Sequence, residues 1–210
     1  MILHWEALAA RQRSVLVRLG PVVTAEGFYL AGGTAVALHL GHRRSLDLNW
    51  FTERPLLDPL ALAGSIHRQN GDLEVRQTAP GTLHASAAGI SVTFLEYRYP
   101  LLQPLEPVET CGCRLASLDD LACMKLAAVV QRGARKDFLD IYALGTRHRP
   151  LSEMLSLYQQ KYAIRDVLHV LQGLSYFDDA DKERMPRLLW RFDWRTVKGT
   201  IQGWVREMVT

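Results

Sequence analysis

Residues 32–52 read "GGTAVALHLGHRRSLDLNWFT", and this stretch combines a glycine pair, an apolar segment, two arginines and an alternating segment with Asp47 and Asn49. An apolar run at 28–31 precedes it and predicts a short strand. Gly32 and Gly33 end that strand, because glycine permits a tight turn and a close approach of the backbone. A short apolar segment at 35–40 then predicts a helix, so the chain runs from strand through glycine turn to helix.

The helix start and the loop behind it carry groups that suit an anion. Thr34 is placed to cap the helix, and backbone N–H groups at a helix N-terminus can meet phosphate. Arg43, Arg44 and Ser45 enter the next strand, where they could hold phosphate or bridge to the carboxylate of Asp47. A solvated basic loop is the alternative reading.

The strand predicted over 45–52 has two different faces. Leu48 and Trp50 point to one side, and Asp47 and Asn49 point to the other, because side chains alternate along a strand. Oxygen ligands at positions i and i+2 are how sites that transfer nucleotides hold Mg²⁺. The spacing of Asp47 and Asn49 alone also fits the polar face of an edge strand. The hypothesis of a nucleotide site therefore rests on this pair together with the glycine turn and the basic loop.

Further elements complete an α+β fold in which a small mixed sheet with flanking helices is followed by a helical lobe. An amphipathic helix is expected within residues 1–20 and another helix at 56–69. Two further strands are expected at 72–77 and 90–99. The pattern becomes helical from Ser117 onward, so the predicted domains are 1–115 and 116–210. The expected helices are one over 118–144 that Gly133 interrupts, and two more at 152–173 and 183–209.

Lys125 is the one charge in the apolar run of the first helix in that lobe. An ammonium there needs a compensating anion or a route to water. A triphosphate would supply the anion, and so would Asp137 or Asp140. Arg132 lies on the same helical stripe, so two cations are expected to point the same way.

The composition excludes several classes of protein. The chain has 210 residues, 48% of them hydrophobic, and a formal net charge of +3. It has no apolar run of about 18 residues that could span a membrane. Charges interrupt the first 20 residues, which argues against a secretory signal and for the cytoplasm. Three cysteines and seven scattered histidines show no metal-ligand spacing, and neither a Walker-type loop nor a Ser/His/Asp grouping is present.

Four stretches, in order, resemble the AbiEii/AbiGii toxin-like nucleotidyltransferase family, a branch of the DNA polymerase β-type nucleotidyltransferase superfamily. They are "FYLAGGTAVALHLGHRRSLDLNWFT", "ISVTFLEYRYPLL", "SLDDLACMKLAAVVQRGARKDFLDIYAL" and "YFDDADKERMPRLLWRFDWRTVKG". The resemblance covers nearly the whole chain. It implies a nucleotidyltransferase-type sheet, a helical lobe that completes the cleft, and a nucleoside triphosphate with Mg²⁺ or Mn²⁺ in that cleft.

The resemblance also assigns roles to residues. Metal ligands are Asp47 and Asn49, and the catalytic set adds Lys125 and Asp137. The residues expected to bind the nucleotide are Gly32, Gly33, Thr34, Arg44, Ser45, Arg132 and Lys136.

One position departs from the family pattern. Asn49 stands where the usual Asp-x-Asp motif has its second aspartate, and an amide removes one negative charge and cannot bridge two metals. The superfamily's third carboxylate comes from a neighbouring strand, and the strand at 90–99 offers Ser91 and Thr93 on one face and Glu96 on the other. Unless Glu96 reaches the site, Asp47 is the only carboxylate of the first lobe there.

The sequence therefore predicts a metal-dependent nucleotidyltransferase with a degenerate Asp-x-Asn motif. It would transfer a nucleoside monophosphate to a hydroxyl of RNA, such as tRNA, or of a protein, as the toxin of a toxin-antitoxin pair. The alternative is a catalytically impaired descendant that binds a nucleotide or an antitoxin-like partner. A structural helical protein is a third reading, so whether the chain is an enzyme stays open.

Overall fold

The computed structural model describes residues 2–69 and 71–209. The chain forms two compact units, each built from several segments. We call residues 8–35 and 45–117 the sheet unit, and residues 2–7, 36–44 and 118–209 the helical unit. The predicted domains, 1–115 and 116–210, stay a prediction.

The sheet unit contains a seven-stranded mixed sheet in the order β3-β4-β5-β2-β1-β7-β6. Strand β2 lies between β1, which is antiparallel to it, and β5, which is parallel to it. The strands are β1 (Tyr29–Ala31), β2 (Leu48–Thr52), β3 (Glu74–Ala79), β4 (Thr82–Ala87), β5 (Ile90–Glu96), β6 (Glu106–Val108) and β7 (Cys113–Leu115).

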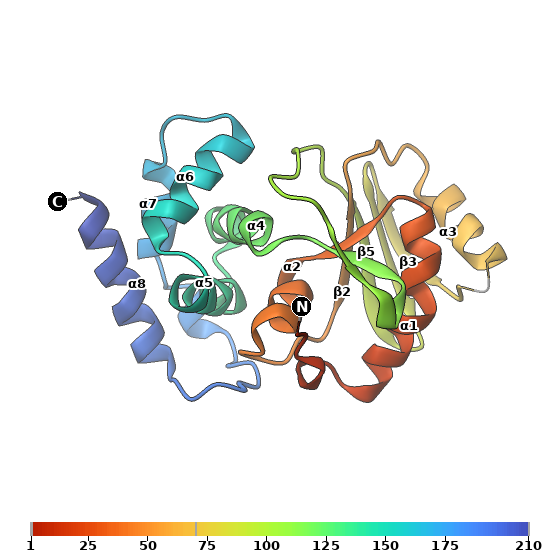
Figure 1. The fold of residues 1–210 in the computed structure, drawn as a ribbon, viewed down its shortest axis with the longest axis horizontal. Coiled ribbons are helices and arrows are strands. Elements are labelled where there is room, and N and C mark those ends of the chain that lie inside the picture. Colours follow the sequence, from red (N-terminus) through yellow and green to blue (C-terminus); the bar gives the residue numbers. More distant parts are fainter. Residues whose placement is uncertain (1, 70, 210) are drawn as a thin grey trace. The chain divides into compact units, whose positions relative to one another are not determined.

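One face of this sheet is the core of the unit. Leu30, Trp50 and Phe94 are fully or almost fully buried on it. Helix α1 (Ala10–Ala25) packs against β5 and β7, and α3 (Pro59–Arg68) packs against β3 and β4 (Figure 1). The opposite face carries Asn49, Thr93 and His84, and we call it the polar face.

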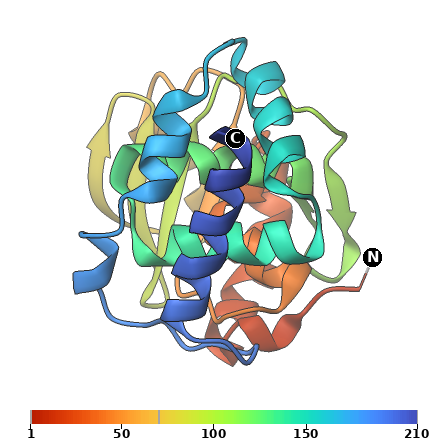
Figure 2. The ribbon, with the colours of Figure 1, turned by 90° about the vertical axis from the view of Figure 1, so that its left-hand side faces the viewer.

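The helical unit is arranged around α4 (Leu118–Arg132), which packs against three other helices of the unit. These are α5 (Arg135–Arg147), α6 (Leu151–Tyr162) and α7 (Leu168–Ser175). Helix α8 (Trp194–Val209) contacts α5, α6 and α7, and Figure 2 shows it in dark blue across that group. No helix of the described residues is long and apolar enough to cross a bilayer.

Helix α2 (Gly32–Leu40) belongs to both units, because its first four residues lie in the sheet unit and the rest in the helical unit. The short 3₁₀ turns η1 (Trp5–Ala7), η2 (Glu109–Cys111) and η3 (Ala180–Lys182) complete the structure.

The α+β fold class and the mixed sheet are confirmed, but several predicted elements are wrong in extent. The helix predicted over 152–173 is two helices, because Ala163 takes a left-handed conformation with φ +52°. The helix predicted from 183 begins only at Trp194. The helix expected within residues 1–20 is α1, and it continues to Ala25 through Pro21. Strands β4, β6 and β7 were not predicted.

Candidate active site

The backbone at Asp47 is held by a buried group of hydrogen bonds. Asp47 lies directly before β2, and the Thr34 hydroxyl donates to its carbonyl oxygen. Thr34 Oγ1 also lies 2.7 Å from Ser45 Oγ, and Gln12 Nε2 donates to the Ser45 carbonyl at 2.9 Å. Thr34, Ser45 and Gln12 are all buried. The start of α2 and the entry to β2 are therefore fixed to each other.

This arrangement gives the Thr34 and Ser45 side chains a structural task. Thr34 is 0% exposed, so its hydroxyl holds the protein backbone in this structure. Both residues were predicted to bind nucleotide, and that role stays a prediction.

Gly32 brings the helix start against Asn49. It has a φ of +68°, which favours glycine, and a Cβ at this position would lie 3.3 Å from Asn49 Nδ2. The N-terminus of α2, with Gly32 and Gly33 half-buried, thus lies beside the polar side chain of β2.

The register of the sheet shows which residues neighbour Asn49 on the polar face. Asn49 pairs with Ala31 of β1 and with Thr93 of β5. Thr93 pairs in turn with His84 of β4, and His84 Nδ1 lies 3.3 Å from Thr93 Oγ1. The four neighbouring strands β1, β2, β5 and β4 therefore place four uncharged or weakly basic side chains in one row at this level.

Glu96 does not belong to this face. It pairs with Thr52, and it lies an odd number of residues from Thr93, so it alternates to the core side of β5. Its carboxylate accepts the Leu56 N–H at 2.8 Å and pairs with Arg98. These two partners, the Leu56 N–H first, lower the pKa of Glu96. Asp47 is thus the one carboxylate that β1, β5 and the described residues 47–52 place on the polar face.

The donor set of the polar face fits a single divalent cation. Asp47 and Asn49 offer a carboxylate and an amide oxygen, and Mg²⁺ in proteins is commonly held by one or two carboxylates together with substrate phosphates. Within the part of the chain that the structure describes, His, Cys, Asp and Glu form no group of three or more suited to a metal. A preformed site for two metals is therefore not supported.

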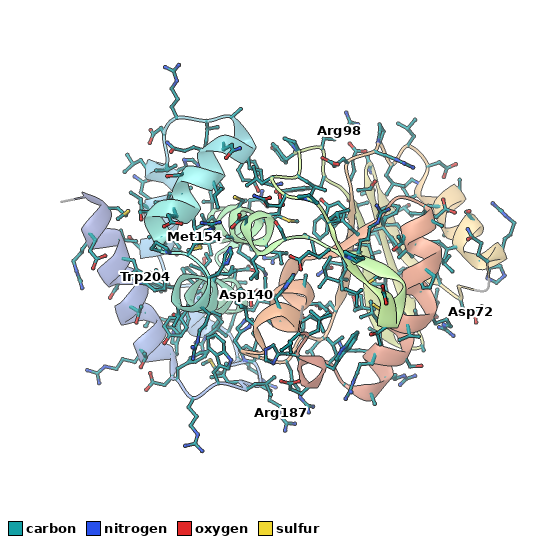
Figure 3. The ribbon with its side chains drawn as sticks, in the orientation of Figure 1. Asp72, Arg98, Asp140, Met154, Arg187 and Trp204 are labelled. Carbon is teal, nitrogen blue, oxygen red and sulfur yellow. The ribbon has the colours of Figure 1, made fainter. Side chains whose placement is uncertain are left out.

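Three of the other predicted residues, Lys125, Arg132 and Asp137, lie in the helical unit in one network with Asp140, a buried aspartate that was not predicted as part of the site. Asp140 Oδ1 accepts from His42 Nε2 at 2.8 Å and from Arg43 Nε at 2.7 Å. Its Oδ2 accepts from Arg43 Nη2 at 2.8 Å and lies 2.6 Å from Lys125 Nζ. Figure 3 shows Asp140 on α5, inside the helical unit.

A second buried aspartate continues this network. Lys125 Nζ donates to Asp137 Oδ1 at 2.9 Å, and Arg132 donates to both oxygens of the same carboxylate at 2.7 and 2.9 Å. Lys125 is 3% exposed, whereas the Arg132 side chain is 55% exposed. Of the two readings for Lys125, the structure shows internal pairing. Arg132 is the end of the network that meets solvent.

The network sets the charge state of its members. Burial alone would raise the pKa of Asp140, but Arg43, Lys125 and the His42 hydrogen bond hold it well below its usual range. Burial would likewise raise the pKa of Asp137, and Lys125 and Arg132 lower it. Burial lowers the pKa of His42 and outweighs its bond to Asp140, so the ring is neutral.

The remaining predicted cations differ in their surroundings. Arg44 is half-buried, and its Nε is buried without a hydrogen-bond partner among the described residues. A buried N–H of this kind normally has an acceptor, so Arg44 suits an incoming anion. Lys136 is exposed on α5.

Arg43 and His42 are the network members that the sequence analysis misread or missed. Arg43 was expected to meet phosphate or Asp47, and instead it forms a bidentate pair with Asp140, 97 residues away. The sequence does contain a signal for these partners. Asp137 and Asp140 lie three residues apart on an otherwise apolar helix face, and carboxylates buried there require cations from elsewhere in the chain.

His42 predicts a pH dependence of stability. Because burial lowers the pKa of His42 in the folded state, the unfolded chain binds more protons once the pH falls below about 6.5, and stability then decreases. Glutamine at 42 can still donate to Asp140 but does not titrate. We expect His42→Gln to flatten the fall in melting temperature between pH 7.5 and 5.5, measured by calorimetry. His67→Gln, at an exposed site, is the control, and an equal flattening there would contradict the assignment.

Comparison with solved structures shows that the fold is that of nucleotidyltransferases. The nucleotidyltransferase toxin MenT4 of Mycobacterium tuberculosis matches with a TM-score of 0.58 at 14% identity, over 98% of this chain and 85% of that one. JHP933 of Helicobacter pylori matches with a TM-score of 0.56 at 15% identity, over 98% and 90%. ANT(2″)-Ia in complex with adenylyl-2″-tobramycin matches with a TM-score of 0.56 at 11% identity, over 73% and 98%.

Sequence comparison gives the family. The family model described as "Nucleotidyl transferase AbiEii toxin, Type IV TA system" matches residues 90–202. The uncharacterized protein aq_aa25 of Aquifex aeolicus is 37% identical over 179 residues, which cover 84% of this chain and 86% of that protein. The chain belongs to the AbiEii nucleotidyltransferase toxin family, and the resemblance inferred from its motifs is confirmed. The region matched by the family model includes Lys125 and Asp137 but not Asp47 or Asn49.

Proposed function

We propose that this protein transfers a nucleoside monophosphate from a nucleoside triphosphate to a hydroxyl group of RNA: the hydroxyl oxygen bonds to the α-phosphorus, the α,β bond breaks, and pyrophosphate leaves. The observation that carries the proposal is the hydrogen-bonded group that fixes Asp47 beside the start of α2. A carboxylate on a surface strand needs no such support. A metal ligand does, because its oxygen must be held close to the phosphates that share the cation.

The proposed roles follow from burial. Asp47 is the main ligand of Mg²⁺ or Mn²⁺, which neutralises charge on the triphosphate, and Asn49 is the auxiliary ligand. The N–H groups of Gly32 and Gly33 at the start of α2 suit phosphate oxygens. Thr34 and Ser45 hold this turn in place.

In the helical unit, Arg44, Arg132 and Lys136 are the predicted residues whose cationic groups suit phosphate. Arg132 has an exposed side chain, and Arg44 has a buried N–H without a partner among the described residues. Lys125 and Asp137 are buried, so we assign them the positioning of Arg132.

RNA is favoured over protein as the acceptor by the segment 184–198. Its four arginines, Arg184, Arg187, Arg191 and Arg195, are all exposed, and its single acidic residue is Asp193. Figure 3 shows Arg187 extending away from the ribbon. A cluster of exposed cations of this kind is typical of surfaces that bind nucleic acid.

We expect Arg187→Glu/Arg191→Glu to weaken binding of total tRNA and to reduce its salt dependence. Each lost phosphate contact lowers the slope of log K against log salt by about 0.7–0.9. Filter binding at several salt concentrations measures this. The control is Arg13→Glu/Arg18→Glu, which reverses two exposed arginines on α1. Equal losses in both pairs would show a net-charge effect and remove this support for RNA.

The transfer itself is tested with each of the four α-labelled nucleoside triphosphates, total cellular RNA and total protein, in Mg²⁺ or Mn²⁺. Asp47→Ala serves as the blank. We expect label on RNA above that blank. Label on protein alone would reassign the acceptor, and no label from any nucleotide would overturn the proposal of transfer.

The second candidate is a catalytically impaired descendant that binds a nucleotide or an antitoxin-like partner. Asn49 is the observation that favours it, because the amide removes a charge from the metal motif. Binding of a triphosphate in the presence of Mg²⁺, without turnover, would decide in its favour.

We also propose that the protein acts in the cytoplasm as the toxin of a toxin-antitoxin pair. Induced expression is then expected to slow growth of the host, and Asp47→Ala is expected to relieve that effect. Equal growth with both proteins would argue against a toxin that acts by transfer.

A further inference from the structure

We propose that the polar face of the sheet binds one divalent cation, only as part of a metal–triphosphate complex, and that Thr93 occupies the position from which a carboxylate would bind a second cation. This inference rests on the site of the proposed function and concerns how many metals it holds. The observation behind it is the register of four strands around Asn49.

The row of side chains at the level of Asn49 contains no anion. It consists of Ala31, Asn49, Thr93 and His84, on β1, β2, β5 and β4. Asp47, directly before β2 and two residues from Asn49, is the one carboxylate that the described residues 47–52 bring to this face. The protein supplies one negative charge here, and a second cation, which the first repels at short distance, would have no protein carboxylate to hold it beside the phosphate oxygens.

Thr93 is the position that matters for a second cation. It is the direct neighbour of Asn49 on a parallel strand, and paired strands lie about 4.8 Å apart. An acidic side chain there would reach the same cation as a residue at 49. Thr93 instead presents a hydroxyl that contacts His84 Nδ1 at 3.3 Å. A neutral hydroxyl is a weaker ligand for Mg²⁺ than a carboxylate.

The acidic residue of β5 cannot replace it. Glu96 lies on the opposite face, and its carboxylate is engaged by the Leu56 N–H and by Arg98. Moving it to the polar face would require a shift of β5 by one residue, which would reverse every side chain of a strand whose Val92 and Phe94 are fully buried.

A lone carboxylate also explains why the cation must arrive with the nucleotide. Mg²⁺ requires six oxygen ligands and gives up its waters reluctantly, so Asp47 and Asn49 alone replace few of them. Phosphate oxygens supply the missing ligands and most of the negative charge. The free cation therefore binds weakly, and the metal–triphosphate complex is the species that binds.

The test is a titration with Mn²⁺, followed by electron paramagnetic resonance of the free ion. It is carried out with and without a nucleoside triphosphate analogue that has a non-cleavable α,β bond. We expect no saturation by Mn²⁺ alone at concentrations up to tenfold above the protein, and one Mn²⁺ per chain with the analogue. Two Mn²⁺ per chain with the analogue, or tight binding of Mn²⁺ alone, would overturn the inference.

Substitutions then locate the missing ligand. Asn49→Asp/Thr93→Asp is expected to bind a second Mn²⁺ with the analogue and to lower the Kd for free Mn²⁺ at least tenfold. Asn49→Asp/Thr82→Asp adds the same charge on the neighbouring strand β4, opposite Leu95, and is the matched control. Equal affinities in the two double variants would overturn the assignment of Thr93.

This experiment does not depend on transfer. One Mn²⁺ per chain with the analogue, together with no labelled product, would leave the metal inference standing and overturn the proposed transfer. Labelled product with two Mn²⁺ per chain would do the reverse. The wild-type stoichiometry decides the inference even if the Thr93 variant does not fold.

Discussion

Asp140→Ala is expected to lower the free energy of unfolding by about 3–5 kcal/mol, the usual cost of removing one partner from a buried ion pair. Asp140 is 0% exposed and receives bonds from His42, Arg43 and Lys125. Without Asp140, the Arg43 guanidinium and the Lys125 ammonium remain buried with less compensating negative charge. Urea denaturation followed by circular dichroism measures the change.

A second aspartate substitution, at an exposed ion pair, separates the effect of burial from the effect of losing one carboxylate. Asp179→Ala also removes an aspartate from an ion pair, but both partners of the Asp179–Lys182 pair are mostly exposed. Exposed pairs contribute little, so the denaturation midpoint of this variant is expected to stay unchanged. A small effect of Asp140→Ala, similar to that of Asp179→Ala, would show that water or other groups compensate the buried cations.

Asn49→Asp is expected to raise the rate of nucleotidyl transfer at least tenfold, whereas Asp47→Ala reduces it to background. The carboxylate at 49 restores the charge that the family motif normally supplies and strengthens the hold on the cation. Initial rates of label transfer to RNA, with the metal below the concentration that saturates the wild type, give both effects. Equal rates in the wild type and in both variants would contradict the metal-ligand assignment.

A conservative control distinguishes charge from shape at this position. Asn49→Ser retains a small polar side chain that fits beside Gly32 but offers no carboxylate. Its rate is expected not to exceed that of the wild type. A rise equal to that of Asn49→Asp would show that the amide obstructs the site by its size rather than by its missing charge.

The polar face could be predicted from the sequence because it depends on local order. The alternation of Leu48, Asp47, Trp50 and Asn49 determines which side chains share a face, and the burial of Leu48 and Trp50 matches it. The glycine pair was recognisable for the same reason, since Gly32 has a conformation that other residues rarely adopt. The prediction that Thr34 caps a helix starting at 35 was wrong, because α2 begins at Gly32 and the Thr34 hydroxyl bonds to the Asp47 carbonyl.

The Asp140 network could not be predicted in the same way. It joins His42 and Arg43 to a carboxylate almost 100 residues later, and no local spacing encodes such a pair. Register is equally non-local: Thr93 has no sequence feature that marks it as the neighbour of Asn49. Strand β4 was missed because "TLHASA" contains few of the large β-branched and aromatic residues that identify strands.

Because α2 is shared between the two units, no single cut along the chain separates them. Each compact unit is discontinuous along the chain, and residues 36–44 belong to the helical unit. A fragment that starts at Leu118 would lack His42 and Arg43. It would leave the Asp140 carboxylate without two of the three side chains that bind it. Such a fragment is therefore expected not to fold stably on its own.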